Sequence, residues 1–369
     1  MAQKEEQETG EMGQKTSQET GGGGGGKLRR PPPPSLPWTV RLKIAALVTA
    51  VDAAQRRDGT MNRFLFSLAD RHAAATPRPD SAGVRSADIT VDSTTGLWAR
   101  VFSSSPPSPA ASSSPPLPVI VYLHGGGFTM LSAASTLMDS LCRRFCREVN
   151  AVIVSVNYRL APEHKFPAAY DDGEAVLRHL AVNGLPTDIA VPIDLTRVFL
   201  AGDSAGGNIA HHVATRWSSS SPSPSLRLAG IMLLQPFFGG EERTESELRL
   251  DGIGPVVNMR RADWSWRAFL PEGADRNHPV AHVTGGEITE DFPPAMVVVG
   301  GYDPLQDWQR RYAAVLRRKG NNSAAAVEVV EFPEAIHSFY AFPELADSGE
   351  LVKKMKAFMD SNSPAKPNA

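Results

Sequence analysis

A serine between two glycines is the residue of this sequence with the clearest chemical potential. Gly202-Asp203-Ser204-Ala205-Gly206 follows an apolar run at residues 198–201 and precedes a helix-like run at residues 208–214. This order predicts a strand, a sharp turn and a helix, because glycines permit a turn in which a side chain would clash. Such a turn holds the serine hydroxyl at the edge of a sheet, where it can attack a carbonyl carbon. A five-residue match is weak alone, so the prediction depends on the partners that this reaction needs.

A glycine-rich segment supplies the first of these partners. Three glycines follow His124, directly after an apolar run at residues 119–123. Backbone N–H groups in such a turn can point at one spot, so we expect an oxyanion hole made by Gly125, Gly126, Gly127 and Ala205. A nucleotide-binding loop is the alternative, but the segment lacks both the GxGxxG spacing and the P-loop lysine. We expect His124 to brace the loop and Asp203 to support the serine turn.

An acidic residue after a later apolar run is the second partner. Asp303 follows residues 295–300 and would reach the same sheet edge as Ser204. Its expected role is to accept the Nδ1 proton of a histidine and to stabilise the imidazolium. The structural alternative is an N-cap before Pro304, a position that aspartate favours. Asp307, four residues later, competes for the same role.

His337 is the candidate base. It follows the last apolar run, and the order Ser204, Asp303, His337 is the hydrolase order of nucleophile, acid and base. In that role His337 takes the serine proton and returns it to the leaving alcohol. The competing histidines lie on the expected helix after the serine or before Asp303 in the chain: His164, His211, His212, His278 and His282.

Composition excludes several other classes of function. The chain has 369 residues, a net charge of −2 and 41% hydrophobic residues, so it can bury a large core and lacks the basic stripe of a nucleic-acid binder. Residues 1–26 are polar and do not resemble a secretory signal, and no stretch is apolar enough to span a membrane. Cys142 and Cys146, four apart, are expected to be small buried hydrophobes rather than metal ligands. We therefore expect a cytoplasmic protein, with the nucleus as a further compartment, and no metal or cofactor.

The chain divides into a tail and one large domain. Residues 1–36 contain six consecutive glycines and a run of prolines, which predict disorder. Two helices are expected next, over about residues 38–70, with Asp58-Gly59 ending the first and Asn62 opening the second. Ser/Pro-rich loops are expected at 103–118 and 218–225, and an insertion at about 239–291 has the size of a small helical cap.

Apolar runs of strand length alternate with helical patterns through the rest of the chain. They lie at residues 87–91, 97–102, 119–123, 152–156, 198–201, 230–234, 295–299 and 327–332. Val/Ile/Leu runs between helices predict a largely parallel sheet that is covered on both faces. The predicted fold class is α/β, as one domain over residues 37–369.

These motifs resemble those of the hormone-sensitive-lipase-like carboxylesterases of the α/β-hydrolase fold. The shared segments are the glycine loop at 124–128, the serine turn with its continuation at 202–208, and two further segments at 157–163 and 166–172. Within that group the sequence is most similar to the plant carboxylesterases, the branch that includes the gibberellin receptors, and residues 56–63 resemble its N-terminal lid. The resemblance implies packing roles for Tyr158 and for the aspartates at 171 and 172.

The resemblance implies a choice between two functions. The first is a serine carboxylester hydrolase acting on uncharged esters of modest size. The second is a small-molecule receptor whose N-terminal helices close over a ligand and recruit a protein partner. Gibberellin receptors look like esterases that have lost the catalytic histidine and altered the glycine loop. This sequence keeps His337 and the loop at 124–127, which favours the enzyme.

Overall fold

The structure is a computed structural model, and it describes residues 29–104, 115–186, 191–220, 225–283, 291–319 and 327–363. Most of the predicted tail, and parts of both Ser/Pro-rich loops, lie outside the described residues. No helix in these ranges is both long and apolar enough to cross a membrane.

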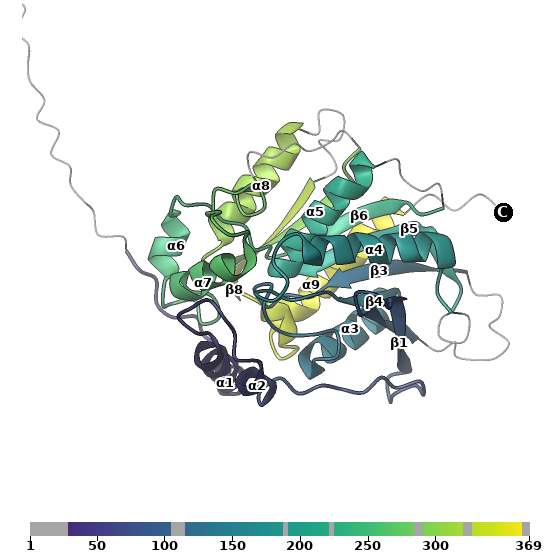
Figure 1. The fold of residues 1–369 in the computed structure, drawn as a ribbon, viewed down its shortest axis with the longest axis horizontal. Helices are drawn as coiled ribbons and strands as arrows, with labels where there is room; N and C mark the ends of the chain where they lie inside the picture. Colours follow the sequence, from purple (N-terminus) through teal and green to yellow (C-terminus); the bar gives the residue numbers. More distant parts are fainter. Residues whose placement is uncertain are drawn as a thin grey trace, which may run out of the picture.

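An eight-stranded sheet runs through the centre of the described molecule (Figure 1). Its spatial order is β1-β2-β4-β3-β5-β6-β7-β8. The pairs β1/β2 and β2/β4 are antiparallel, and every later pair is parallel. The predicted, largely parallel sheet is therefore confirmed. The strands are β1 (Val84–Asp92), β2 (Leu97–Ser104), β3 (Leu117–Leu123), β4 (Val152–Asn157), β5 (Ile193–Asp203), β6 (Leu228–Leu234), β7 (Ala295–Tyr302) and β8 (Val327–Ile336).

Helices cover both faces of this sheet, as strand β3 illustrates. Val119, Val121 and Leu123 pack into one core with the helices α4 (Ala168–Asn183), α5 (Ala205–Ser219) and α8 (Gln306–Lys319). Ile120 and Tyr122 point the other way, into a second core with α3 (Thr136–Val149) and α9 (Ala346–Asn362). Because successive side chains of a strand face opposite sides, a strand that is apolar throughout needs cover on both.

Two N-terminal helices lie outside this alternation. They are α1 (Trp38–Ala54) and α2 (Arg63–Ser67), and they appear at the lower left of Figure 1. Both pack against the cap insertion, whose helices are α6 (Glu245–Leu250) and α7 (Met259–Phe269), and they share a small core with α7. The expected stripe of α1 is seen, since Val40, Ile44 and Val51 are buried.

The ends of these helices agree only in part with the prediction. Asn62 caps α2, as expected, by accepting a hydrogen bond from the Leu65 N–H at 3.2 Å. The first helix, however, ends at Ala54, before the predicted stop at Asp58-Gly59. Asp58 instead orders the following turn by accepting a hydrogen bond from the Thr60 N–H at 2.9 Å. An Asx-type turn thus replaces the last helical turn.

Both cysteines are buried on α3, as predicted. Burial raises the pKa of the Cys146 thiol to about 11 and also raises the pKa of Cys142. Both side chains therefore behave as small hydrophobes with an inert thiol. In the described part of the chain, no three His, Cys, Asp or Glu side chains come together as a group that could hold a metal ion.

Candidate active site

Four segments with candidate chemistry meet at one edge of the sheet. The glycine loop follows β3, Ser204 follows β5, Asp303 follows β7 and His337 follows β8. These four strands are parallel, so their carboxyl ends lie at the same edge, where open α/β sheets bind ligands.

Ser204 lies in a sharply strained turn between β5 and α5. Its φ of 51° and ψ of −117° are rare for a residue with a side chain and cost about 1–3 kcal/mol. The turn is held by hydrogen bonds on both sides, from the Ser204 N–H to the Leu234 carbonyl at 2.9 Å and from the Phe237 N–H to the Ser204 carbonyl at 2.8 Å. Gly206 is required because a Cβ there would lie 1.9 Å from the Leu123 carbonyl oxygen.

His337 is paired with Asp303. The distance from His337 Nδ1 to Asp303 Oδ2 is 2.8 Å, and both side chains are almost completely buried. Because a carboxylate only accepts, Nδ1 carries the proton and Nε2 of the neutral ring remains an acceptor. Gln309 Nε2 donates to the same carboxylate oxygen at 2.8 Å, and the Leu305 N–H donates to the other oxygen at 3.0 Å. Asp303 therefore caps the start of α8 and contacts the histidine at the same time.

Asp307, the competing acid, faces elsewhere. Its carboxylate accepts hydrogen bonds from the N–H and the hydroxyl of Ser246 in the cap insertion, at 2.8 and 2.9 Å. Two of the competing histidines make other contacts. The Nδ1 of His211 lies 2.9 Å from the Tyr312 hydroxyl, and the Nε2 of His212 lies 3.3 Å from the Val280 carbonyl oxygen. Of the candidates, His337 and Asp303 are brought together.

The prediction for Gly125 is wrong. Its N–H donates to Asp203 Oδ1 at 2.8 Å, so it is not available to an oxyanion. The N–H groups of Gly126, Gly127 and Ala205 have no acceptor within the described residues. The physical reason is the buried Asp203 carboxylate, which needs several donors and recruits the nearest loop amide.

Asp203 fixes the glycine loop to the serine turn. Besides the Gly125 N–H, it accepts hydrogen bonds from the hydroxyls of Tyr122 at 2.6 Å and Tyr340 at 3.2 Å. Burial raises the pKa of this carboxyl in spite of the three donors. Loop, serine turn and histidine segment thus share one buried hydrogen-bond network.

His124 lies beneath the same loop. Its Nδ1 is 2.8 Å from the Gly125 carbonyl oxygen, and its ring stacks on Tyr158 with 4.3 Å between centroids. The Tyr158 hydroxyl donates to the His124 carbonyl at 2.7 Å. Burial lowers the pKa of His124 to about 4, so the ring is neutral near pH 7.

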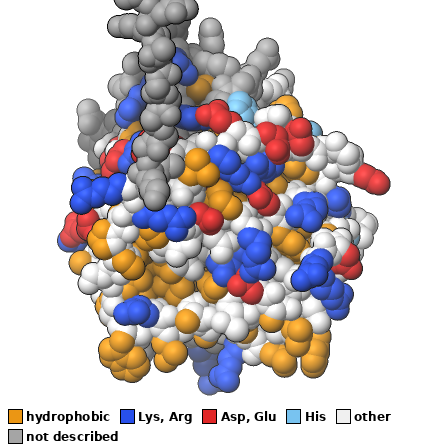
Figure 2. Space-filling model, turned by 90° about the vertical axis from the view of Figure 1, so that its left-hand side faces the viewer, with side chains coloured by type: hydrophobic (Ala, Val, Ile, Leu, Met, Phe, Trp, Pro, Cys, Tyr) orange, Lys and Arg blue, Asp and Glu red, His pale blue; other side chains and the backbone are white. Residues whose placement is uncertain are grey.

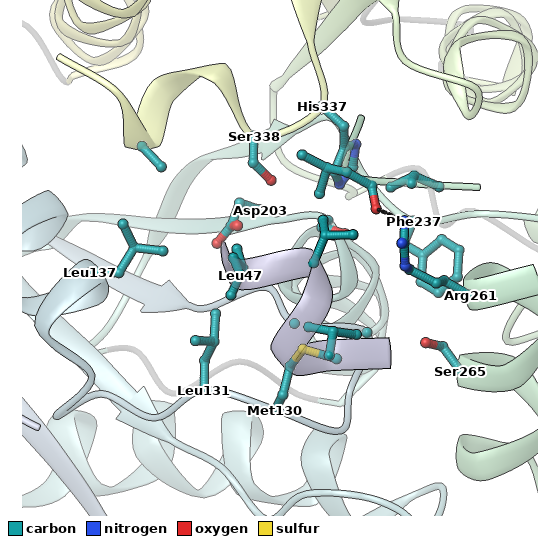
Figure 3. A pocket seen from close by; sticks show the side chains of 18 of the residues that line it. Leu47, Met130, Leu131, Leu137, Asp203, Phe237, Arg261, Ser265, His337 and Ser338 are labelled. Carbon is teal, nitrogen blue, oxygen red and sulfur yellow. Dashed lines mark hydrogen bonds between the residues drawn. The ribbon is translucent and has the colours of Figure 1, made fainter. Parts of the chain in front are cut away.

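Ser204 and His337 line one cavity with a volume of about 130 Å³ (Figure 3). Among the described residues no hydrogen bond joins the Ser204 hydroxyl to His337; catalytic contacts of this kind often tighten only with substrate. Most of the lining is apolar and comes from α1, the glycine loop, the cap insertion and the segment after His337. Its larger members are Leu47, Val48, Val51, Met130, Leu131, Leu137, Met138, Phe237, Val256, Val257 and Phe342.

Several residues near the site could not be found from the sequence. Gln309 contacts Asp303, Gln235 holds the segment of His337 by accepting from the Ser338 N–H at 2.8 Å, and two tyrosines bind Asp203. None of them lies in a motif, and each reaches the site through tertiary packing. The apolar repeat of α1 was the one available signal for the cavity wall, and it indicated burial rather than a ligand.

Comparison with known proteins shows the family to which this fold belongs. Residues 120–341 match a family described as alpha/beta hydrolase fold, and residues 69–163 match the carboxylesterase family. The chain is 40% identical to a gibberellin receptor of Arabidopsis thaliana over 338 residues, which cover 88% of this chain and 95% of the receptor. It is 38% identical to carboxylesterase 20 of the same plant over 286 residues, which cover 74% of this chain and 84% of that protein.

Solved structures of esterases share the fold. An ester-hydrolase from the metagenome of Lake Arreo superposes with a TM-score of 0.69 at 27% identity, covering 88% of this chain and 98% of that one. A hyperthermophilic esterase from Pyrobaculum calidifontis gives 0.65 at 28% identity, covering 88% and 93%. The fold predicted from the sequence is thereby confirmed. The chain belongs to the α/β-hydrolase family, within its plant group of carboxylesterases and gibberellin receptors.

Proposed function

We propose that this protein is a serine carboxylester hydrolase. The observation that carries the proposal is the buried His337–Asp303 pair, at 2.8 Å, whose histidine lines one cavity with the strained Ser204 turn. A hydroxyl becomes a nucleophile when a base removes its proton, and a carboxylate that accepts the Nδ1 hydrogen bond of a neutral histidine orients such a base.

In the proposed mechanism Ser204 Oγ attacks the ester carbonyl carbon while His337 Nε2 takes the hydroxyl proton. Asp303 stabilises the imidazolium, and the oxyanion accepts hydrogen bonds from Gly126, Gly127 and Ala205. The tetrahedral intermediate collapses, His337 protonates the leaving alcohol, and the acyl group remains on Ser204. Water then attacks the acyl carbon with His337 as base, which releases the acid and restores the serine.

The lining of the cavity supports uncharged substrates of modest size. Apolar side chains from α1, the cap insertion and the segment after His337 enclose the space above Ser204. Small-molecule sites are commonly apolar with a few polar groups that fix orientation. Carboxylic esters with short or medium chains meet these conditions.

The test is turnover of p-nitrophenyl acetate and butyrate by the wild-type protein and by Ser204→Ala. We expect hydrolysis by the wild type and a loss of about 10³-fold or more in the variant, on the precedent of other serine hydrolases. Equal rates for the two proteins would overturn the proposal.

A second function is favoured by one further observation. The N-terminal helices expose large hydrophobic side chains next to the candidate site, and Figure 2 shows hydrophobic atoms gathered along the lower part of this face. Together with the similarity to gibberellin receptors, this surface supports a small-molecule receptor that recruits a protein partner. The exposed side chains of these helices are Trp38, Leu42, Phe64, Leu65 and Leu68. Tight ligand binding without turnover would favour the receptor.

A further inference from the structure

One wall of the cavity carries polar side chains that the proposed reaction does not use. They are Gln55 at the end of α1, and Arg261 and Ser265 on α7. Figure 3 shows Arg261 and Ser265 on one side of the cavity, across from Leu131 and Leu137. Residues four apart on a helix share a face, so the two α7 side chains are neighbours.

Gln55 lies at the contact between α1 and α7. Asp52, three residues before it, binds Arg261, and the backbone carbonyl of Arg56, the next residue, accepts a hydrogen bond from Trp264 Nε1 at 2.7 Å. These two contacts bracket Gln55 and hold it against the α7 segment that carries the other polar groups.

The Gln55 amide has no partner in the described part of the protein. Its nitrogen is buried, and neither its nitrogen nor its oxygen makes a hydrogen bond there. A buried donor without an acceptor costs about 1–3 kcal/mol, and buried amides in proteins are nearly always satisfied. Because Gln55 is also one of the residues that line the cavity, we take its unpaired amide as an indication of an acceptor that enters with a ligand.

Ser265 and Arg261 extend the same wall. Ser265 is a buried residue whose hydroxyl makes no hydrogen bond to any described residue, and a Cβ on Gly127 would lie 2.6 Å from that oxygen. Arg261 uses Nε and one Nη2 hydrogen on Asp52, at 2.8 and 2.7 Å, and one Nη1 hydrogen on the Val256 carbonyl at 3.2 Å. A guanidinium has five N–H donors, so two of them remain.

The charge of this wall favours a neutral partner. Asp52 binds the Arg261 guanidinium through both carboxylate oxygens and so offsets its charge at the wall; it also pairs with Arg260, whose side chain is largely exposed to solvent. What remains unpaired is a set of N–H and O–H donors beside an apolar space. A ketone, ether or hydroxyl oxygen satisfies such donors without the desolvation cost of an anion.

We propose that Gln55, with Arg261 and Ser265, forms a polar subsite that binds a neutral oxygen acceptor of the substrate. The favoured esters then carry an oxygen function at a distance from the scissile bond rather than a plain alkyl chain. The statement about esters rests on the proposed function, whereas the subsite itself is defined by binding.

Binding to the Ser204→Ala protein tests the subsite whether or not the chain is an esterase. Isothermal titration would compare phenyl levulinate with phenyl valerate, and acetonyl butyrate with isobutyl butyrate, together with longer homologues of each pair. Each pair differs by a carbonyl in place of a saturated carbon, on the acyl side or on the alcohol side. Monophenyl succinate adds the carboxylate counterpart of the levulinate ester.

We expect the ketone to bind about tenfold tighter in at least one pair, because it satisfies a buried donor. Adding Gln55→Leu to the Ser204→Ala protein should bring the ratio of ketone affinity to saturated-ester affinity close to one. Adding Ser265→Ala instead should reduce that ratio. Thr49→Val, on the exposed outer face of α1, should leave the ratio unchanged. Thermal melting of each variant reports its folding, and the ratio within one protein cancels a general loss of affinity.

Three results would overturn the subsite: no preference in any pair, a preference that survives Gln55→Leu, or tighter binding of monophenyl succinate than of phenyl levulinate. Turnover of the same esters by the wild-type protein separately tests the hydrolase. Binding with the expected affinity ratio but without turnover would refute the hydrolase and support the subsite. Turnover of the esters without any binding preference would support the hydrolase and refute the subsite.

Discussion

At the scale of single residues, Asp303 combines two roles that the sequence presented as alternatives. It contacts the backbone at the start of α8 and it binds His337, and Gln309 fixes the same carboxylate. A carboxylate held at both oxygens has little freedom to rotate. Under the proposed function, it holds the imidazole in the tautomer whose Nε2 can take a proton.

Asp303→Asn should therefore remove most of the ester-hydrolase activity. The asparagine amide can present an N–H to His337 and favour the wrong tautomer, which costs about 10⁴-fold in kcat on the protease precedent. Steady-state kinetics with p-nitrophenyl butyrate measure the effect. Asp307→Asn is the matched control, since Asp307 binds Ser246 instead. Loss of activity in the control but not in Asp303→Asn would move the acid role to Asp307.

Local motifs made this part of the site predictable. Ser204, Asp303 and His337 each follow a strand directly, so their chain neighbours indicate where they lie. Gly125 shows the limit of that reasoning. Its N–H is taken by a carboxylate from another strand, and no local pattern reveals which donor a distant buried acid recruits.

At the scale of elements, the contact between α1 and α7 decides how firmly the cavity is covered. Asp52 on α1 binds Arg261 on α7 through two hydrogen bonds, and this interaction lowers the pKa of Asp52. The pair stays ionised at neutral pH. Together with the Arg260–Asp52 pair and the hydrogen bond from Trp264 Nε1 to the Arg56 carbonyl, it links α1 to α7 beside Gln55.

Asp52→Ala should loosen α1 without unfolding the domain. Losing a charged hydrogen-bond pair that is partly exposed costs about 1–1.5 kcal/mol, which corresponds to roughly tenfold faster local opening. Hydrogen exchange followed by mass spectrometry should show faster exchange in residues 38–54 and unchanged exchange in α9. Arg41→Ala, at an exposed position of the same helix, serves as the control. Equal exchange of α1 in Asp52→Ala and the control would contradict a latching role.

Strands were easier to predict than the N-terminal helices and the cap. The inner strands β3, β4, β6 and β7 are almost continuous apolar runs, because the sheet is covered on both faces. The end of α1 was misplaced because the turn at Asp58 replaces helical hydrogen bonds with a side-chain contact. The wall of Gln55, Arg261 and Ser265 was missed because it joins segments about 200 residues apart through packing alone.

At the scale of the whole molecule, buried histidines tie stability to pH. His124 and His211 are buried, and burial lowers the pKa of His124 to about 4 and that of His211 well below its ordinary value. A histidine with a lowered pKa in the fold binds its proton more readily after unfolding. The contribution of the neutral histidine to the free energy of unfolding is complete above about pH 6.5 and is lost as the pH falls toward 4.

The free energy of unfolding should therefore fall between pH 7.5 and pH 5. His124 alone should contribute a loss of about 2 kcal/mol over that interval, and His211 should add a loss of the same sign. Urea unfolding at several pH values measures it. His211→Asn should flatten the dependence, and substitution of the exposed His72 should not. A free energy that is constant between pH 7.5 and 5 would contradict this account.

The central claim is that Ser204 is a nucleophile activated by His337 and Asp303. The most direct measurement is mass spectrometry of peptides from protein treated with a fluorophosphonate, which stays on the serine that attacks it. We predict one adduct per chain, on Ser204, formed far more slowly in His337→Ala and absent in Ser204→Ala. An unmodified Ser204, or the same rate of labelling without His337, would contradict the account.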